Sequence, residues 1–368
     1  MNSIMNILPE RKTPCNVWVQ FMRCIDTFIC AFYNEASFFR RYAMLSIPYS
    51  RYLIYPIPWY SFLIVSGAAL AIFLACREER RLGLEKDTII DLSLILLPCG
   101  IVGARIYYVI FSWEQFRDDL VSVLRIWEGG LAIYGGIIAG LAALLLFSRF
   151  RRLSPLLLCD IIVPGLALAQ SIGRWGNYFN IEAYGLQVTD SALCFFPLAV
   201  QVPAAGNSWH LATFFFESLW DFLVFLYLFL SRKKLSAFRG SIFYRYLFLY
   251  AAGRLMIEEL RLDSLYASSS IRISQLLSVL VCIFVLARYL FRLFLVKRPA
   301  AAVRYAIAAA SLAVSLALLI YSLFPSCFAG YSHKAVFIFL MSGSLSMMIL
   351  FFIIVHHLHT GVPRHADQ

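Results

Sequence analysis

Arginine, asparagine and glutamate side chains gather in a short segment that directly follows an apolar run. The segment GRWGNYFNIEAYG at 173–185 comes after LLLCDIIVPGLALAQSI and contains Arg174, Asn177, Asn180 and Glu182. A guanidinium can offer a planar fork of donors to a carboxylate or phosphate, and the asparagines add neutral donors. A polar helix cap would use similar residues but does not require so many converging groups. We therefore expect an anion-binding site in this segment.

Glycines and aromatic residues in the same segment predict how it is held. Gly173 and Gly176 leave room for a backbone turn at the end of the preceding apolar run. Trp175, Tyr178 and Phe179 are residue types that settle at the level of lipid headgroups. The segment is accordingly expected at the membrane surface or just within it.

A second group of charged residues lies in YAAGRLMIEELRLDSLY at 250–266. Arg254, Glu258 and Arg261 recur at i, i+4 and i+7 and so are predicted to share one face of a helix. Glu258 could neutralise one arginine and lock the helix to its neighbours. Two arginines for one carboxylate would nevertheless leave a positive surplus, and the abundant anion at that depth in a bilayer is a lipid phosphate.

Two further apolar stretches carry polar residues whose role the sequence leaves open. Arg105 in CGIVGARIYYVIF either snorkels to the interface or takes part in a polar site. Tyr134 precedes a Gly pair in WEGGLAIYGGIIAG, where the backbone could unwind to admit a headgroup or the glycines could simply pack helices together.

Glu217 and Asp221 stand one turn apart in the apolar run FFFESLWD. Unpaired carboxylates would be costly there. Arg105 or Arg261 are plausible partners for them.

The composition places these residues in a membrane protein. Of 368 residues, 61% are hydrophobic and 14% are charged, against roughly a quarter charged in soluble domains. The net charge of +11 comes from Lys and Arg in short connectors such as 77–81 and 231–234. This pattern is typical of cytoplasmic loops and anionic lipid surfaces, so nucleic acid is not expected as a partner.

Apolar runs of about 20 residues predict an all-α, polytopic bundle of nine helices. The expected spans are 59–76, 88–112, 130–149, 155–172, 209–230, 241–260, 272–291, 304–324 and 335–357. Basic connectors such as 77–86 and 148–152 are predicted to face the cytoplasm, and polar stretches such as 113–128 and 173–208 to face outward.

Three regions follow from this pattern. Residues 1–50 are predicted to be an interfacial or partly inserted N-terminal extension, and 51–297 to be a seven-span catalytic core. Residues 298–368 are predicted to add a two-helix extension with a cytoplasmic, His-rich tail. Because no charged residue falls inside the apolar runs of that extension, we expect it to be dispensable for chemistry.

The sequence contains no HExxH, no GxSxG and no P-loop, so we expect neither a metal nor a cofactor. With these motifs excluded, the remaining pattern is a set of arginines that could face a phosphate, with no obvious nucleophile in the protein.

At GRWGNYFNIEAYG the sequence resembles the signature of the prolipoprotein diacylglyceryl transferases, with Tyr178 where phenylalanine is usual. The similarity continues in order through about residues 55–292, in PWYSF, VGARIYY, WEGGLAIYGG, FFFESLWD and GRLMIEELRLDSL. The resemblance implies a multi-span enzyme of the bacterial plasma membrane with its site towards the outer leaflet. Its substrates would be phosphatidylglycerol, whose diacylglyceryl group is transferred, and the lipobox cysteine thiol of a prolipoprotein.

The resemblance also implies site residues. We expect catalytic roles for Arg174, Arg254, Tyr134 and Glu182. Substrate binding is expected of Arg174, Asn177, Tyr60, Tyr108, Arg105, Asn180, Gly185, Glu258 and Arg261. Two departures from the family matter: Tyr134 stands where many members have a histidine considered a proton acceptor, and Leu211 and Ala212 replace a common His-Pro pair. A tyrosine with a pKa near 10 is a poor base at neutral pH unless neighbouring arginines lower that pKa, so the proton acceptor stays open.

Two other classes of function would also place arginines at membrane depth. A transporter of phosphate-bearing solutes usually shows an inverted repeat, and no repeat is visible in this sequence. A scaffold subunit would use the same polar faces for helix association, so that substitution of Arg174 would harm oligomers rather than turnover.

Overall fold

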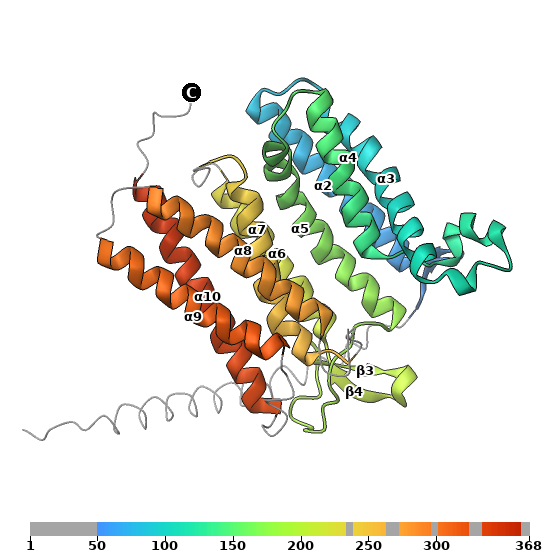
Figure 1. Cartoon of the computed structure of the whole chain (residues 1–368). Helices are drawn as coiled ribbons and strands as arrows, with labels where there is room; N and C mark the ends of the chain where they lie inside the picture. The colour runs from blue at the N-terminus through green and yellow to red at the C-terminus, as the bar shows by residue number, and fades with distance from the viewer. Residues whose placement is uncertain (1–49, 233–237, 263–271, 296–300, 324–332, 362–368) are drawn as a thin grey trace, which may run out of the picture. The chain divides into compact units, whose positions relative to one another are not determined.

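The computed structural model describes residues 50–232, 238–262, 272–295, 301–323 and 333–361. Long helices run side by side in it (Figure 1). Their bounds are α2 Trp59–Leu82, α3 Thr88–Phe111, α4 Ile133–Phe150, α5 Pro155–Asn180, α6 Thr213–Ser231, α7 Ser241–Ile257, α8 Ile273–Leu295, α9 Ala301–Leu323 and α10 His333–Gly361. The expected N-terminal extension, 1–50, lies almost wholly outside the described residues.

The prediction of a polytopic helix bundle is confirmed. Nine long helices occur within the described ranges, and eight of them are long and apolar enough to cross a membrane. The ninth, α7, has 17 residues and carries Arg245 and Arg254. Its length keeps it just below the usual criterion for a span, although its neighbours in the bundle bury most of it.

The connector predicted at 77–86 is largely wrong, because α2 continues to Leu82 and ends at Gly83, whose φ of 68° suits glycine. Two acidic residues explain the longer helix. Glu78 is bonded by Arg81 of its own helix and by Arg232 at the end of α6. Glu79 accepts hydrogen bonds from the backbone N–H groups of Asp87 and Ile89, which satisfies donors at the start of α3.

The principal hydrophobic core draws its buried residues from α5 to α10. Helix α7 is central to it: Phe248 is fully buried and stacks on Phe351 of α10, with ring centroids 4.2 Å apart. A smaller core lies among α2, α3, α4 and the start of α5. Helix α10 therefore packs onto the helix that carries Arg254, and α9 packs onto α8 and α10.

Short strands occur at two places in the chain. Strands β1 Tyr52–Ile54 and β2 Ile57–Pro58 pair antiparallel just before α2. Residues 186–212 form a separate compact unit, in which β3 Ala199–Val202 pairs antiparallel with β4 Ser208–Leu211 across the short helix η4 Pro203–Ala205. His210, the histidine closest to the missing His-Pro pair, is buried in this unit and bonds Ser208.

Candidate active site

The signature segment is helical for most of its length. Helix α5 continues through Asn180, so the backbone turn predicted at Gly173 and Gly176 is not formed. Gly176 instead makes room for a ring: a Cβ placed there would lie 2.7 Å from Cδ2 of Tyr60 in α2. The small residue thus lets Tyr60 pack against the helix that carries Arg174, and the phenol lies within electrostatic range of Arg174 and Glu182.

Helix α5 ends in two residues with left-handed backbone. Ile181 and Ala183 have φ of 58° and 54°, and the N–H of Glu182 donates to the carbonyl of Asn177 at 2.9 Å. The carbonyl of Ala183 accepts a hydrogen bond from the hydroxyl of Thr213, the first residue of α6. Glu182 itself is exposed, whereas the turn around it is anchored to the next helix.

Glu217 of α6 is the centre of the charged site. Its carboxylate is only 4% exposed and lies against three guanidinium groups. Arg174 Nη1 is 2.8 Å from Oε2, Arg261 Nη1 is 3.1 Å from Oε1, and Arg254 also donates to Oε1. Arginines from three separate segments of the chain therefore converge on one buried side chain.

Close packing of α6 against α7 places Glu217 beside Arg254. Gly253 leaves room for the indole of Trp220, whose Nε1 would be 2.0 Å from an added Cβ. That indole N–H donates to the carbonyl of Leu249 at 2.9 Å. A larger residue at Gly253 would separate the two helices at the level of the charged site.

The predicted helix face at 254–261 is only half formed. Arg254 and Glu258 make the expected i, i+4 ion pair, with Nη2 and Oε2 2.7 Å apart. Helix α7 ends at Ile257, however, and the 3-10 helix η5 Glu258–Leu260 follows it, so Arg261 lies in extended backbone. An antiparallel bridge between Gly185 and Arg261 holds that backbone, which connects the end of the signature segment to the third arginine.

The charges of this cluster balance. Arg174, Arg254 and Arg261 stand against Glu217, Glu258 and, at 3.9 Å from Nε of Arg174, Asp221. The three arginines are therefore matched in number by three carboxylates, of which Glu217 and Glu258 make close ion pairs with them. An anion that binds here has to draw guanidinium donors away from Glu217 or share them with it.

Three residues around the cluster were not singled out from the sequence. Tyr250 of α7 lies within electrostatic range of Arg174 and Arg254. Tyr246, one turn earlier, donates a 2.8 Å hydrogen bond to Gln170 of α5. The signal for the two tyrosines in the sequence is spacing: Tyr246, Tyr250 and Arg254 recur every fourth residue.

Arg105 has a different environment from the one expected. It is buried, and its guanidinium donates to the backbone carbonyls of Ser122, Val123, Gly129 and Gly130 at 2.6–3.0 Å. The proposed pairing of Arg105 with Glu217 or Asp221 is wrong, because the guanidinium bonds these carbonyl groups instead. Arg105 fixes the fold of the 113–132 connector, with its charge 5.0 Å above the ring of Phe116.

Tyr134 lies in the first turn of α4, half-buried, with its ring 6.5 Å from that of Tyr107. The Gly pair after it packs helices together: Cβ atoms at Gly103 and Gly135 would each collide with the opposite backbone. The backbone is helical at this pair, Gly135 and Gly136, whereas Gly129 and Gly130 earlier in the same stretch have φ of 96° and 71° and lie outside any helix. Tyr108 bonds Gln115, and within the described residues the ion-pair network includes neither Tyr134 nor Glu182.

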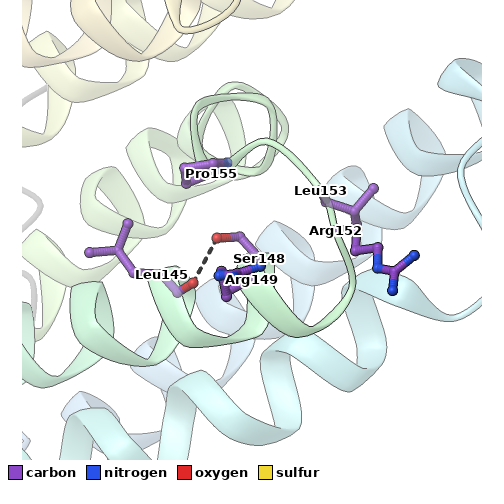
Figure 2. Close-up of a pocket in the computed structure, with 6 residues that line it drawn as sticks. All are labelled: Leu145, Ser148, Arg149, Arg152, Leu153 and Pro155. Carbon is purple, nitrogen blue, oxygen red and sulfur yellow. Dashed lines mark hydrogen bonds between the residues drawn. The ribbon is translucent and has the colours of Figure 1, made fainter.

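A pocket of about 440 Å³ lies elsewhere, at the turn between α4 and α5 (Figure 2). It is lined by Leu145, Ser148, Arg149, Arg152, Leu153 and Pro155. Arg152 points away from Pro155, so the two arginines do not converge. Arg174 is about 28 Å further along α5 at 1.5 Å per residue, which separates this pocket from the charged site.

In the described part of the chain, no three His, Cys, Asp or Glu side chains group as metal ligands.

Comparisons with known proteins show the family to which the chain is similar. The family model of prolipoprotein diacylglyceryl transferases matches residues 50–291. A phosphatidylglycerol–prolipoprotein diacylglyceryl transferase of Enterococcus faecalis is 46% identical over 230 residues, which are 61% of this chain and 83% of that protein. Proteins of the same name are 44% identical in Limosilactobacillus reuteri, over 61% of this chain and 83% of theirs, and 43% identical in Streptococcus pyogenes, over 66% and 91%.

Proposed function

Because the chain belongs to the prolipoprotein diacylglyceryl transferase family, we propose that it moves the diacylglyceryl group of phosphatidylglycerol to the lipobox cysteine of a prolipoprotein. The relatives carry both substrates in their names. The observation that supports this function most directly is the convergence of Arg174, Arg254 and Arg261 on the buried carboxylate of Glu217.

The reaction exchanges a carbon–oxygen bond of the lipid for a carbon–sulfur bond and moves the thiol proton to a base. The thiol sulfur of the peptide bonds to a glycerol carbon of the lipid, and the bond from that carbon to a phosphate oxygen breaks. The thiol proton passes to a base, and glycerol phosphate leaves. The phosphate changes from a diester with one negative charge to a monoester with greater charge, so fixed cationic donors stabilise the transition state more than the bound lipid.

The arginines are proposed to supply those donors. Arg174 and Arg254 bind opposite oxygens of Glu217, so one bidentate anion already spans both guanidinium groups. A phosphate is a similar bidentate acceptor and can take over some of these contacts. Arg261 continues to neutralise Glu217 when that happens, since it bonds the same carboxylate from a third direction.

Other residues are proposed to shape the site around the phosphate. Glu258 orients Arg254, and Gly185 orients Arg261 through its backbone bridge. Tyr60 packs beside the signature helix, where Asn177 and Asn180 form the last turn. These contacts support lipid binding for Tyr60, Asn177 and Asn180. Glu182, exposed next to them, is kept as a catalytic candidate.

Arg105 and Tyr108 are proposed to act indirectly. Arg105 is saturated by carbonyl groups of the 113–132 connector, and Tyr108 lies against Gly130 at the end of it. Their contribution to substrate binding would be to hold that connector. Tyr134, which follows it, is the candidate proton acceptor or hydrogen-bond donor for the thiol.

The site is proposed to face the outer leaflet. Basic residues follow the ends of α4 and α6, as with Arg151, Arg152 and Arg232, and these ends face the cytoplasm by the positive-inside rule. Arg174 and Arg254 lie near the ends of α5 and α7, and Glu217 near the start of α6. Helices that alternate in direction bring all three to the opposite membrane face, where a secreted precursor arrives.

The test is a transfer assay with the full chain in vesicles of phosphatidylglycerol. A lipobox peptide is added and its mass is followed, with a Cys→Ser peptide as the control. The wild-type chain should add a diacylglyceryl mass to the cysteine peptide alone. Absence of that product from folded, membrane-inserted protein would reject the proposed function, and loss of oligomers rather than turnover in Arg174→Lys would favour a scaffold.

A further inference from the structure

We propose that the C-terminal helix α9 takes part in positioning the active site, through the hydroxyl of Tyr321 and the carboxylate of Glu259. This inference rests on the proposed function and adds a residue beyond the family match, which ends at residue 291. Helix α9 spans Ala301–Leu323, entirely within the part of the chain that the sequence analysis expects to be dispensable.

Glu259 is the residue next to Glu258, and the two face different neighbours. In a 3-10 helix, successive side chains diverge by about 120°, since there are three residues per turn. Glu258 therefore meets Arg254 of the charged site, at 2.7 Å. Glu259 meets side chains of α8 and α9. The short helix η5 therefore connects the C-terminal helices to the charged site.

Three side chains bond one oxygen of Glu259. Arg272, just before α8, donates at 2.6 Å, Gln275 of α8 at 3.2 Å and Tyr321 of α9 at 3.3 Å. Arg272 also donates to the carbonyl of Glu258 at 3.0 Å. Each of these bonds restrains the short helix η5, which lies between Arg254 and Arg261. The hydroxyl of Tyr321 is the contribution from outside residues 50–291, the part of the chain that the family model matches.

Burial and packing make this connection rigid. Glu259, Gln275 and Tyr321 are all at least nine-tenths buried, so water competes little for these hydrogen bonds. The ring of Tyr321 also packs against Phe339 of α10. Helix α10 in turn stacks Phe351 on Phe248 of α7, which is the helix of Arg254. The C-terminal helices thus contact the elements of the charged site in two places: α9 through Tyr321 and Glu259, and α10 through Phe351 and Phe248.

Tyr321 acts through Glu259 and is a positioning residue rather than a catalytic one. Its hydroxyl should fix the orientation of η5, and with it the geometry of Arg254 and Glu258. Loss of the hydroxyl should therefore lower kcat more than it raises KM, because the lipid can still bind while the donors are less well aligned in the transition state.

The experiment compares Tyr321→Phe with Tyr305→Phe, a matched variant on the same helix whose ring is two-thirds exposed. Hydrogen exchange at peptides covering 254–261 is measured first, with the full chain in nanodiscs. Tyr321→Phe should speed exchange there while Tyr305→Phe does not. Unchanged exchange in Tyr321→Phe would overturn the inference, whatever the enzyme's activity.

Transfer kinetics then measure the consequence. Tyr321→Phe should lower kcat about three- to tenfold, as expected for one lost hydrogen bond, with KM for phosphatidylglycerol nearly unchanged. Combined with Glu259→Gln it should cost less than the product of the two single effects, because both act on one contact. A wild-type kcat in Tyr321→Phe, or fully independent effects, would overturn the positioning role. An inactive wild-type chain would instead reject the proposed function. The hydrogen-exchange data would still show whether the Tyr321–Glu259 hydrogen bond restrains residues 254–261.

Discussion

Arg174 and Arg254, from helices α5 and α7, hold the two different oxygens of the Glu217 carboxylate. Arg174 Nη1 lies 2.8 Å from Oε2, and Arg254 donates to Oε1. Two guanidinium groups are thus fixed at a spacing that one bidentate anion satisfies. A phosphate of a lipid headgroup presents the same kind of acceptor pair.

The first prediction is that lysine cannot replace either arginine. Arg174→Lys and Arg254→Lys keep the charge but lose the planar fork. Since the loss of one transition-state donor commonly costs about 10²–10³ in rate, both variants should transfer lipid far below the wild-type rate. Initial rates of peptide modification are the measurement, on protein verified as folded. Near wild-type rates would leave these arginines as structural partners of Glu217 and Glu258.

The second prediction concerns the stability of the cluster. Glu217→Gln keeps the side-chain shape but leaves three partly buried guanidinium groups around a buried, neutral amide. Removing one partner of a buried ion pair typically costs roughly 3–5 kcal/mol, so the variant should unfold at a clearly lower temperature in detergent. The matched control is Glu182→Gln, an exposed glutamate of the same region. Equal melting temperatures for both variants would contradict a stabilising role for Glu217.

The third prediction uses two glycines of one helix. Gly173→Ala meets no atom within 4 Å, whereas the methyl of Gly176→Ala would lie 2.7 Å from the ring of Tyr60. Both changes raise helix propensity by about 1 kcal/mol, so any difference between them reports the clash at Tyr60. We expect a reduced transfer rate and a raised KM for the lipid in Gly176→Ala only. Identical kinetics in the two variants would separate Tyr60 from lipid binding.

The fourth prediction separates two roles for Tyr134. Within the described residues, the ring of Tyr134 contacts that of Tyr107, and no arginine of the charged site bonds its hydroxyl. Tyr134→Phe should therefore reduce the rate only modestly, as loss of a hydrogen bond would. Complete loss of activity, together with a wild-type rate that rises towards high pH, would assign Tyr134 as the base.

Several features of this protein could be predicted from the sequence because they depend on local composition. A run of about 20 apolar residues has to form a helix in lipid, so the spans were placed to within a few residues for most helices. The pair Arg254 and Glu258 was predictable for the same reason, since i, i+4 spacing on a helix brings side chains together.

Only the tertiary structure decided which charges meet. Glu217 is 37 residues from Arg254 and 44 from Arg261, and no spacing rule connects such distances. The same limit applies to Arg105, whose partners are backbone carbonyls of a connector, and to Tyr321, which reaches Glu259 from 62 residues away. The sequence alone determined that charged side chains buried within the membrane had to pair with other groups of the protein. The packing of helices against one another determined which partners they found, because that choice depends on close contacts such as Gly253 with Trp220.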